Sequence, residues 1–351
     1  MSAIGAILGI RSSPSSPRAD EPVSAAKPRV RLLAMGGTIA VKESAEGALH
    51  ALNADELVAL IPGSSVELES VDVAVGSSVA FTGAQLLRLA RSVVESADDG
   101  ADGVLITHGT DTLEETLYFL ALTVPRGRLG VVVTGAMRPA DTPGADGPAN
   151  LVAGLAVAVH EPARVVGPLL VLDGLMHSAR FATKVSAQSV GGFASPAAGP
   201  LGRVLEGHPS IWFTPAYEDY LGLPDGDDLP RVELMRMTLG SGPEALSAVV
   251  ATGPAGVVID GFGGGHVPPA LTEIIENSVS SGIPVVVTSR VGDGPTNSST
   301  YGAPGCELDL QRRGVIMAGA ISGVKARLRL AVALALGLNA RDAFPLDDGT
   351  G

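Results

Sequence analysis

The sequence predicts an α/β protein of two domains: a larger N-terminal domain with a mostly parallel, doubly wound sheet, and a smaller C-terminal α/β domain. Apolar runs of strand length, each stopped by glycine, alternate along the chain with segments of helical spacing. Runs that are apolar on both faces are typical of a parallel sheet covered by helices. At roughly 150 residues per domain, the 351 residues fit two domains.

The first 28 residues predict a disordered tail. A short apolar stretch at 3–10 is followed by Arg11 and by a segment rich in serine and proline. A cleaved secretory signal is the alternative, but it would place basic residues before the apolar stretch. We therefore expect a tail on a cytoplasmic protein. The longest apolar runs elsewhere are about half of the ~18 residues that a membrane-spanning helix needs, so no membrane partner is expected.

The N-terminal domain is expected at 29–222. Its strands are predicted at 30–34, 103–107, 130–133 and 168–172, and its helices at 82–97, 113–123 and 148–160. Because parallel strands need a crossover between them, this strand–loop–helix alternation favours a mostly parallel sheet.

The pattern changes at 202–236, which carries the only tryptophan and an acidic, proline-containing run. We interpret this stretch as a hairpin followed by an interdomain linker at 223–245. The alternation then resumes in the C-terminal domain, which is expected at 246–345. Its strands are predicted at 256–259, 284–288 and 314–318, and its helices at 269–280 and 323–336.

Composition excludes several classes of protein. The chain has 24 Lys+Arg against 37 Asp+Glu, a net charge of −13, and no basic cluster, so nucleic acid is not an expected partner. The single cysteine, Cys306, forms neither an internal disulfide nor a cysteine-based zinc site. No His-x-x-x-His spacing is present, and the glycine-rich loops lack the dinucleotide and Walker fingerprints. The sequence therefore predicts no metal and no cofactor.

Hydroxyl and carboxylate groups follow many of the predicted strands, at the edge where parallel α/β sheets bind ligands. These residues are Thr38, Ser77, Ser78, Thr110, Asp111, Thr134 and Ser289. Lys184 is the only charged residue between 181 and 192. A lysine with little water around it gives up its proton more easily, and it can then take the proton of a threonine nucleophile. Thr38, Thr110, Asp111 and Lys184 thus form a hypothetical nucleophile and proton relay.

Each of these residues also has a purely structural interpretation. Asp111 is placed to cap the N-terminus of the helix at 112–122. Lys184 is equally consistent with a surface lysine whose stem lies on apolar surface. His108 is expected to hydrogen-bond the backbone near a strand end.

Four blocks of the sequence resemble one known family, the bacterial-type L-asparaginases. The blocks are AMGGTIA at 34–40, ITHGTDTLEET at 106–116, TGAMRP at 134–139 and ADGPANL at 145–151. The likeness extends from about residue 29 to 338, in the family's order. It implies hydrolysis of the side-chain amide of asparagine, and often of glutamine, with no cofactor.

The resemblance also implies roles for single residues. Thr38 falls at the family's nucleophile, while Thr110, Asp111 and Lys184 fall at the second threonine, its acid and the lysine that completes the relay. Asp111 would also bind the α-ammonium group, and Thr110 remains a rival nucleophile. Residues implied to bind substrate are Gly37, Gly76, Ser77, Ser78, Gly109 and Ala136. Backbone N–H groups near Thr110 and Ala136 are candidates for an oxyanion hole.

The chain departs from the family's pattern in two places. The lid at 39–51 has no tyrosine and only His50, which leaves Tyr301 as a substitute from elsewhere, for example from a neighbouring subunit. In relatives, a partner subunit of a homotetramer built from dimers supplies an Asn and a Glu to the substrate amine. Here the matching stretches have glycines at 261–265 and no Glu at 293–300. Candidate replacements are Asp260, Asp293 and Asn297.

Three other functions stay open at this point. The first is a preference for glutamine, since one methylene separates the two substrates. The second is the related tRNA-dependent amidotransferase subunit. The net charge of −13 argues against this function. The third is a non-catalytic amino-acid-binding protein, which the missing lid tyrosine favours.

Overall fold

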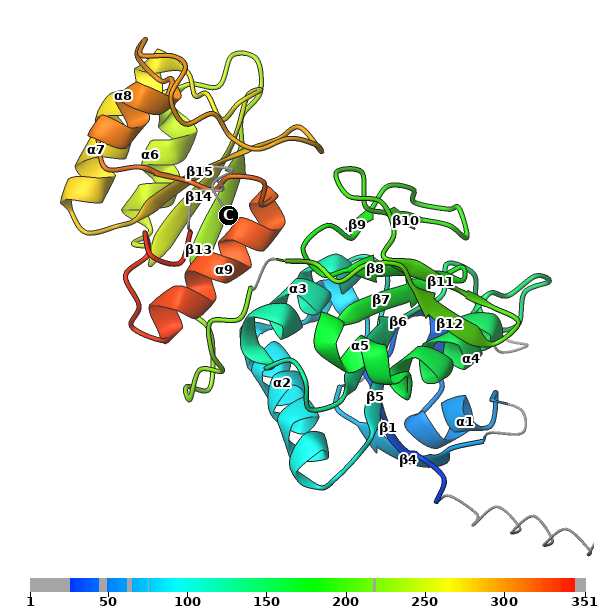
Figure 1. The fold of residues 1–351 in the computed structure, drawn as a ribbon. Helices are drawn as coiled ribbons and strands as arrows, with labels where there is room; N and C mark the ends of the chain where they lie inside the picture. Colours follow the sequence, from blue (N-terminus) through cyan, green and yellow to red (C-terminus); the bar gives the residue numbers. More distant parts are fainter. Residues whose placement is uncertain (1–25, 44–48, 62–64, 75, 217–218, 345–351) are drawn as a thin grey trace, which may run out of the picture.

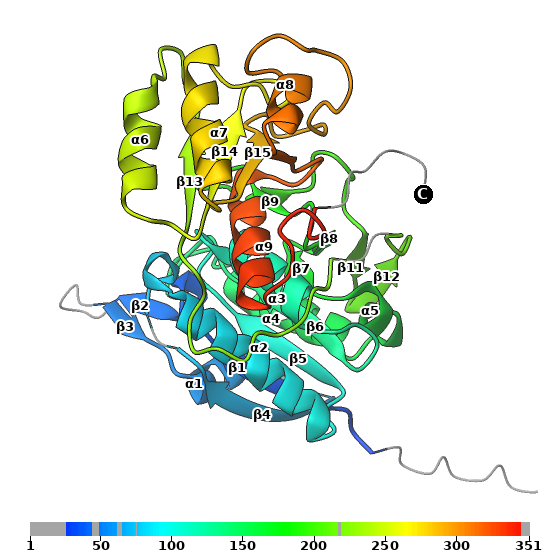
Figure 2. The ribbon, with the colours of Figure 1, turned by 90° about the vertical axis from the view of Figure 1, so that its left-hand side faces the viewer.

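The computed structural model describes residues 26–43, 49–61, 65–74, 76–216 and 219–344, which form two α/β domains (Figure 1). Most of the predicted tail lies outside the described residues. The domains meet along the helix α9 (Gly323–Ala335), which belongs to the smaller domain and packs on α3 (Leu113–Thr123) of the larger one. Figure 2 shows α9 between the two sheets. None of the described helices has both the length and the apolar character needed to cross a membrane.

The larger domain is built on an eight-stranded sheet with the order β12-β11-β8-β7-β6-β5-β1-β4. The bounds are β1 Arg29–Ala34, β4 Glu67–Asp72, β5 Gly103–Thr107, β6 Gly130–Thr134, β7 Leu169–Leu172, β8 Leu175–Ser178, β11 Gly202–Leu205 and β12 His208–Ile211. The five strands from β4 to β7 pair in parallel, and β8, β11 and β12 extend the sheet antiparallel. The mostly parallel sheet is confirmed, as is the hairpin predicted after residue 202.

Helices cover both faces of this sheet, as the doubly wound prediction requires. Successive residues of β5 show why: Val104 and Ile106 join one apolar core with α2 (Gly83–Asp98) and α3, while Leu105 joins another with α4 (Gly147–Ala158). Side chains of a strand alternate between faces, so a strand buried on both faces is apolar at every position. The shorter helices of this domain are α1 (Ala54–Val58) and α5 (Glu161–Val166).

The smaller domain has a four-stranded parallel sheet with the order β13-β14-β15-β16. Its strands are β13 Val232–Arg236, β14 Gly256–Gly261, β15 Val285–Ser289 and β16 Ile316–Met317, and its other helices are α6 Pro243–Ala251, α7 Thr272–Ser280 and α8 Glu307–Arg312. The strand β13 lies inside the stretch predicted to be a linker at 223–245. We therefore place the start of this domain at β13, which was missed because only Val232 of the strand is fully buried.

A buried group of charges joins the two domains. Asp219 accepts hydrogen bonds from Arg180 of the larger domain (2.8 Å), from Arg329 of α9 (2.9 Å) and from the Tyr118 hydroxyl of α3 (3.1 Å). Burial alone would raise the pKa of Asp219, yet the hydrogen bonds and charges of Arg180 and Arg329 hold it below its usual value. Burial also raises the pKa of Tyr118, so this hydroxyl remains a hydrogen-bond donor.

The change Asp219→Ala is expected to destabilise the protein by about 3–5 kcal/mol, because it removes the buried carboxylate that pairs with both Arg180 and Arg329. Urea unfolding at several pH values measures this effect. Since the folded-state pKa is depressed, the difference should be complete above the unfolded pKa of about 3.9 and should shrink as pH falls through the folded value. Asp227→Ala, at an exposed position nearby, is the control. Equal unfolding free energies for the two variants would contradict the prediction.

Candidate active site

Three loops meet where β1, β4 and β5 end. Gly36 and Gly37 have φ values of 75° and 92°, which few residues other than glycine adopt. A Cβ on Gly36 would lie 2.6 Å from the Gly76 oxygen, and one on Gly37 would overlap the backbone nitrogen of Gly109. Gly37 is therefore the point at which the first loop touches the third. Thr38 is the next residue along the chain, so it lies beside this contact.

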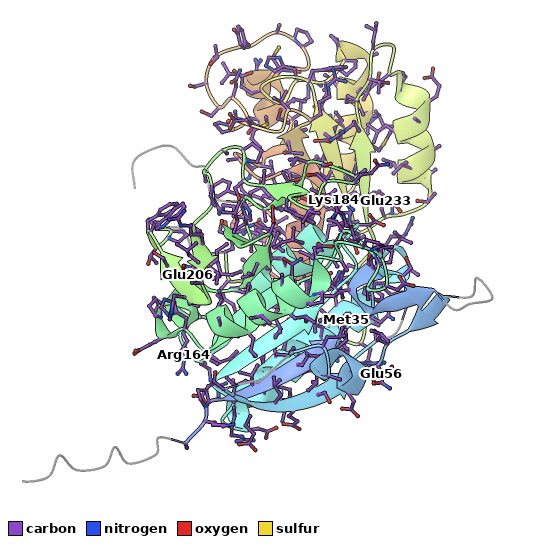
Figure 3. The ribbon with its side chains drawn as sticks, turned by 90° about the vertical axis from the view of Figure 1, so that its right-hand side faces the viewer. Met35, Glu56, Arg164, Lys184, Glu206 and Glu233 are labelled. Atoms are coloured by element: carbon purple, nitrogen blue, oxygen red, sulfur yellow. The ribbon has the colours of Figure 1, made fainter. Side chains whose placement is uncertain are left out.

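Lys184 reaches this edge of the sheet from another part of the chain. It ends the short strand β9 (Thr183–Lys184), which pairs with β10 (Phe193–Ala194). Its Nζ lies 2.9 Å from the Thr110 Oγ1 and 2.7 Å from the Asp111 Oδ1. The Lys184 side chain is 17% exposed and that of Asp111 is 64% exposed. Figure 3 places Lys184 near the boundary between the two domains.

Asp111 does not cap the following helix. The N-cap of α3 is Thr112, whose hydroxyl donates to the Ser78 carbonyl at 3.0 Å. The Asp111 carboxylate is therefore available to Lys184. The hydroxyl of Ser78 lies against Gly109, where a Cβ would come within 2.6 Å of the Ser78 Oγ. Ser77 is exposed and makes no side-chain cap bond.

The loop after β6 is fixed by two residues of the block at 145–151 for which the sequence alone predicted no role, Asp146 and Asn150. Asp146 accepts from the backbone N–H groups of Met137 (3.0 Å) and Arg138 (2.9 Å). The Asn150 side-chain amide donates to the Gly135 carbonyl (3.0 Å). Ala136, between these anchors, is 1% exposed. Thr110 and Ala136 are loop residues whose own N–H groups donate to no acceptor within the described chain.

The change Asp146→Ala is expected to lower kcat by about 100-fold, because a displacement of about 1 Å in a positioning loop has an effect of that size. The lost hydrogen bonds should also cost about 1.5–3 kcal/mol of stability. Asparagine turnover and urea unfolding measure the two effects. Asp98→Ala, which removes an exposed ion pair with Arg128, is the control. Unchanged turnover in the folded Asp146 variant would contradict this assignment.

His108 has the structural role expected from the sequence. It is fully buried, with Nδ1 at 2.7 Å from the Gly109 oxygen and Nε2 at 2.9 Å from the Thr116 hydroxyl. Burial lowers its pKa to about 4, so the ring is neutral at neutral pH. The ring thereby holds the loop on which Thr110 stands.

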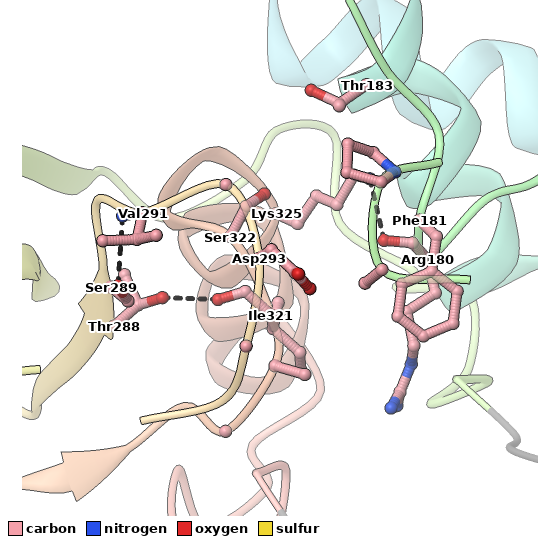
Figure 4. Close-up of a pocket in the computed structure, with 16 residues that line it drawn as sticks. Arg180, Phe181, Thr183, Thr288, Ser289, Val291, Asp293, Ile321, Ser322 and Lys325 are labelled. Carbon is pink, nitrogen blue, oxygen red and sulfur yellow. Dashed lines mark hydrogen bonds between the residues drawn. The ribbon is translucent and has the colours of Figure 1, made fainter. Parts of the chain in front are cut away.

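Of the candidates from the smaller domain, Asp293 lines a pocket together with Thr183, the residue before Lys184 (Figure 4), while the others have partners of their own. Tyr301 stacks edge-on with His266 at a centroid distance of 5.5 Å, and the Asp260 carboxylate accepts from Arg236 at 2.7 Å. The Asn297 side chain fills the space beside Gly264. Within the part of the single chain that is described, no hydrogen bond or ion pair joins Tyr301, Asp260, Asp293 or Asn297 to the Thr110–Asp111–Lys184 group. His50 lies in β3 (Leu49–Ala51), which pairs with β2 (Val41–Glu43).

Among the described residues, no three His, Cys, Asp or Glu side chains are grouped so that they could hold a metal ion. What the edge of the sheet does offer is an amine in contact with both a hydroxyl and a carboxylate, together with the N–H groups of Thr110 and Ala136, which have no acceptor in the described chain. Such a group is suited to nucleophilic attack on a carbonyl carbon. The fold and this group together define a two-domain α/β hydrolase.

Comparison with known proteins identifies the family. Residues 29–216 match the family "Asparaginase, N-terminal", and residues 231–343 match "Glutaminase/Asparaginase C-terminal domain". The chain is 32% identical to an L-asparaginase of Bacillus licheniformis (88% of this chain, 95% of that protein) and 32% identical to L-asparaginase 2 of Escherichia coli strain K12 (88% and 89%). The structure of a probable cytoplasmic L-asparaginase from Campylobacter jejuni superposes with a TM-score of 0.81, at 30% identity, over 91% of this chain and 99% of that one. The chain belongs to the asparaginase family.

Proposed function

We propose that this enzyme hydrolyses the side-chain amide of L-asparagine to L-aspartate and ammonia through an acyl-threonine intermediate. The observation that carries the proposal is the position of the Lys184 Nζ, within hydrogen-bond distance of both Thr110 and Asp111. Membership of the family and the names of the relatives support the choice of substrate.

The proposed reaction has two steps. In the first, the Thr38 hydroxyl attacks the amide carbon and its proton passes to the Thr110–Lys184 pair. The C–N bond then breaks as this proton is delivered to the leaving nitrogen, which departs as ammonia. In the second, water gives a proton to the same pair as it attacks the resulting ester, the C–O bond to threonine breaks, the proton returns to the Thr38 oxygen, and aspartate leaves. Asp111 orients Lys184 and binds the substrate's α-ammonium. The free N–H groups of Thr110 and Ala136 stabilise the oxygen that becomes negative in each step.

The remaining substrate contacts are proposed from the loops that touch. The three backbones can approach the ligand closely because each has a glycine there, at Gly37, Gly76 and Gly109. The α-carboxylate of the ligand is bound by Ser77 and Ser78. The hairpin β2–β3 closes over the site and excludes water.

We propose that the enzyme is cytoplasmic and assembles as a homotetramer built from dimers. The description of the Campylobacter jejuni protein supports the first point. Exposed apolar side chains on the small domain's loops, Val291 (51%) and Tyr301 (52%), support the second, because a partner subunit would cover them. Sedimentation velocity at several concentrations tests the assembly, and a monomer at every concentration would contradict it.

A coupled ammonia assay with purified protein tests the proposed activity, with L-asparagine and L-glutamine compared by kcat/KM. A higher value for asparagine supports the proposal, and a higher value for glutamine assigns a glutaminase. Calorimetric titration of asparagine is run in parallel. Binding without release of ammonia would show a non-catalytic binding protein and would overturn the proposal.

A further inference from the structure

A buried lysine of the smaller domain holds the backbone that carries Lys184. Lys325, in the first turn of α9, is 2% exposed. Its Nζ donates to the Arg180 carbonyl at 2.8 Å and to the Ala182 carbonyl at 2.6 Å. Figure 4 shows the Lys325 side chain extending from α9 to the backbone at Arg180 and Phe181. One cation thus fixes two carbonyls in the three residues that precede β9.

These carbonyls lie next to the catalytic lysine in sequence. Only Thr183 separates Ala182 from Lys184, whose amine must stay within hydrogen-bond distance of Thr110 and Asp111. The strand β9 is only two residues long and pairs with an equally short strand. The Ala182 N–H also donates to the Ser178 carbonyl, and the Val185 N–H to the Gly192 carbonyl. The two bonds from Lys325 add to these in fixing the backbone directly before Lys184.

Charged residues of the larger domain also influence the pKa of Lys325. Burial lowers the pKa of Lys325 to about 8, against the attraction of Glu114 and Asp219, while Arg180 lowers it further. Glu114 stands in the first turn of α3, directly after the loop of Thr110 and Asp111. Its Oε2 is buried without a hydrogen-bond partner in the described chain.

We propose that Lys325 is a positioning residue for this enzyme's reaction: through the carbonyls of Arg180 and Ala182 it ties the Lys184 segment to α9, so the catalytic geometry of the larger domain depends on the smaller one. The proposal rests on the proposed function, in which Lys184 is the base. Lys325 touches neither substrate nor reacting atoms, and it acts through Lys184.

Lys325→Met in the full-length enzyme is the test, because methionine has a similar length but no donor and no charge. We expect kcat for asparagine to fall at least about tenfold, KM to change by less than about threefold, and the pH–rate profile to shift as Lys184 loses its fixed place. Arg327→Met is the matched control. It removes a cation from the same helix that is 35% exposed and paired with Glu115, and it should leave kcat within about twofold.

A double-mutant cycle with Lys184→Met separates positioning from general stabilisation. If Lys325 acts through Lys184, then Lys325→Met should cause no further loss of kcat in the Lys184→Met background. Unchanged kcat and pH profile in folded Lys325→Met, or an equal loss in both backgrounds, would overturn the proposal. If Lys325→Met does not fold, Lys325→Gln replaces it, because the shorter amide keeps a polar end but cannot hold both carbonyls. Its kcat is expected to fall at least about threefold, and unchanged turnover there overturns the proposal.

A structural readout keeps this inference separate from the proposed function. In a crystal structure of Lys325→Met, the Lys184 Nζ should leave hydrogen-bond distance of the Thr110 Oγ1, whatever substrate the enzyme uses. An Nζ that stays in place refutes the positioning role. A wild-type enzyme that releases no ammonia refutes the proposed function alone.

Discussion

Replacing Lys184 with methionine is expected to lower kcat for asparagine by about 10³-fold, within the 10²–10⁴ range of general acid–base catalysis. The variant removes the amine that lies 2.9 Å from the Thr110 Oγ1 and 2.7 Å from the Asp111 Oδ1. Stability should hardly change, because an ion pair with one partner 64% exposed contributes about 0–1 kcal/mol. Single-turnover ammonia release and thermal unfolding measure the two effects.

Lys27→Met is the matched control for this experiment, since it makes the same substitution at an exposed position. Its turnover should equal that of the wild type. A Lys184→Met enzyme that keeps more than about a tenth of the wild-type kcat would remove Lys184 from the role of base, since general-base catalysis contributes at least about 10²-fold. A large fall in unfolding temperature would instead indicate that Lys184 acts through folding.

The buried strands of the larger domain could be predicted because burial on both faces leaves a continuous apolar run. The run at 103–107 coincides with β5, and the helix predicted at 113–123 coincides with α3. His108 and Gly109 follow the strand, and the helix ends at Thr123, just before Val124 and Pro125. Local sequence and tertiary environment agree at these places, so a local pattern is sufficient.

Edge strands could not be predicted in the same way. The strand β4 reads ELESVD and has no fully buried residue, because it lies at the edge of the sheet. The strands β9 and β10 are two residues each, and their pairing is decided by residues distant in sequence. Such elements depend on non-local pairing, and a propensity argument does not detect them.

The site was predicted in part and by two routes. Hydroxyl and carboxylate groups at strand ends indicated an edge of the sheet, and the family resemblance implied roles for Thr110, Asp111 and Lys184, which stay predictions. The distances among the three come only from the structure. Lys325 was missed because it stands in an amphipathic helix with Arg327 and Arg329, where a lysine usually faces solvent. Its burial follows from the packing of two domains.

Thr38→Ala is expected to abolish the acyl-enzyme and to lower kcat by about 10⁴-fold or more, because an alanine has no oxygen with which to form the ester. Thr110→Ala should also lower kcat strongly, yet a slow acyl-enzyme should still form on Thr38. The geometry makes this comparison necessary, since Thr110, not Thr38, has the amine of Lys184 at 2.9 Å. Mass spectrometry of enzyme quenched in acid during turnover measures the ester, and peptide mapping locates it.

The two variants distinguish the two orders of attack. If the ester is found on the peptide with Thr38 in wild type and persists in Thr110→Ala, Thr38 is the first nucleophile and the Thr110–Lys184 pair is its base. If it is found on Thr110 and persists in Thr38→Ala, the roles are reversed and Lys184 activates Thr110 directly. Ser289→Ala, at the end of β15 in the smaller domain, is the hydroxyl control and should leave the amount of ester unchanged. An ester in neither place, with full turnover, would exclude covalent catalysis by threonine, since water would then attack the amide directly.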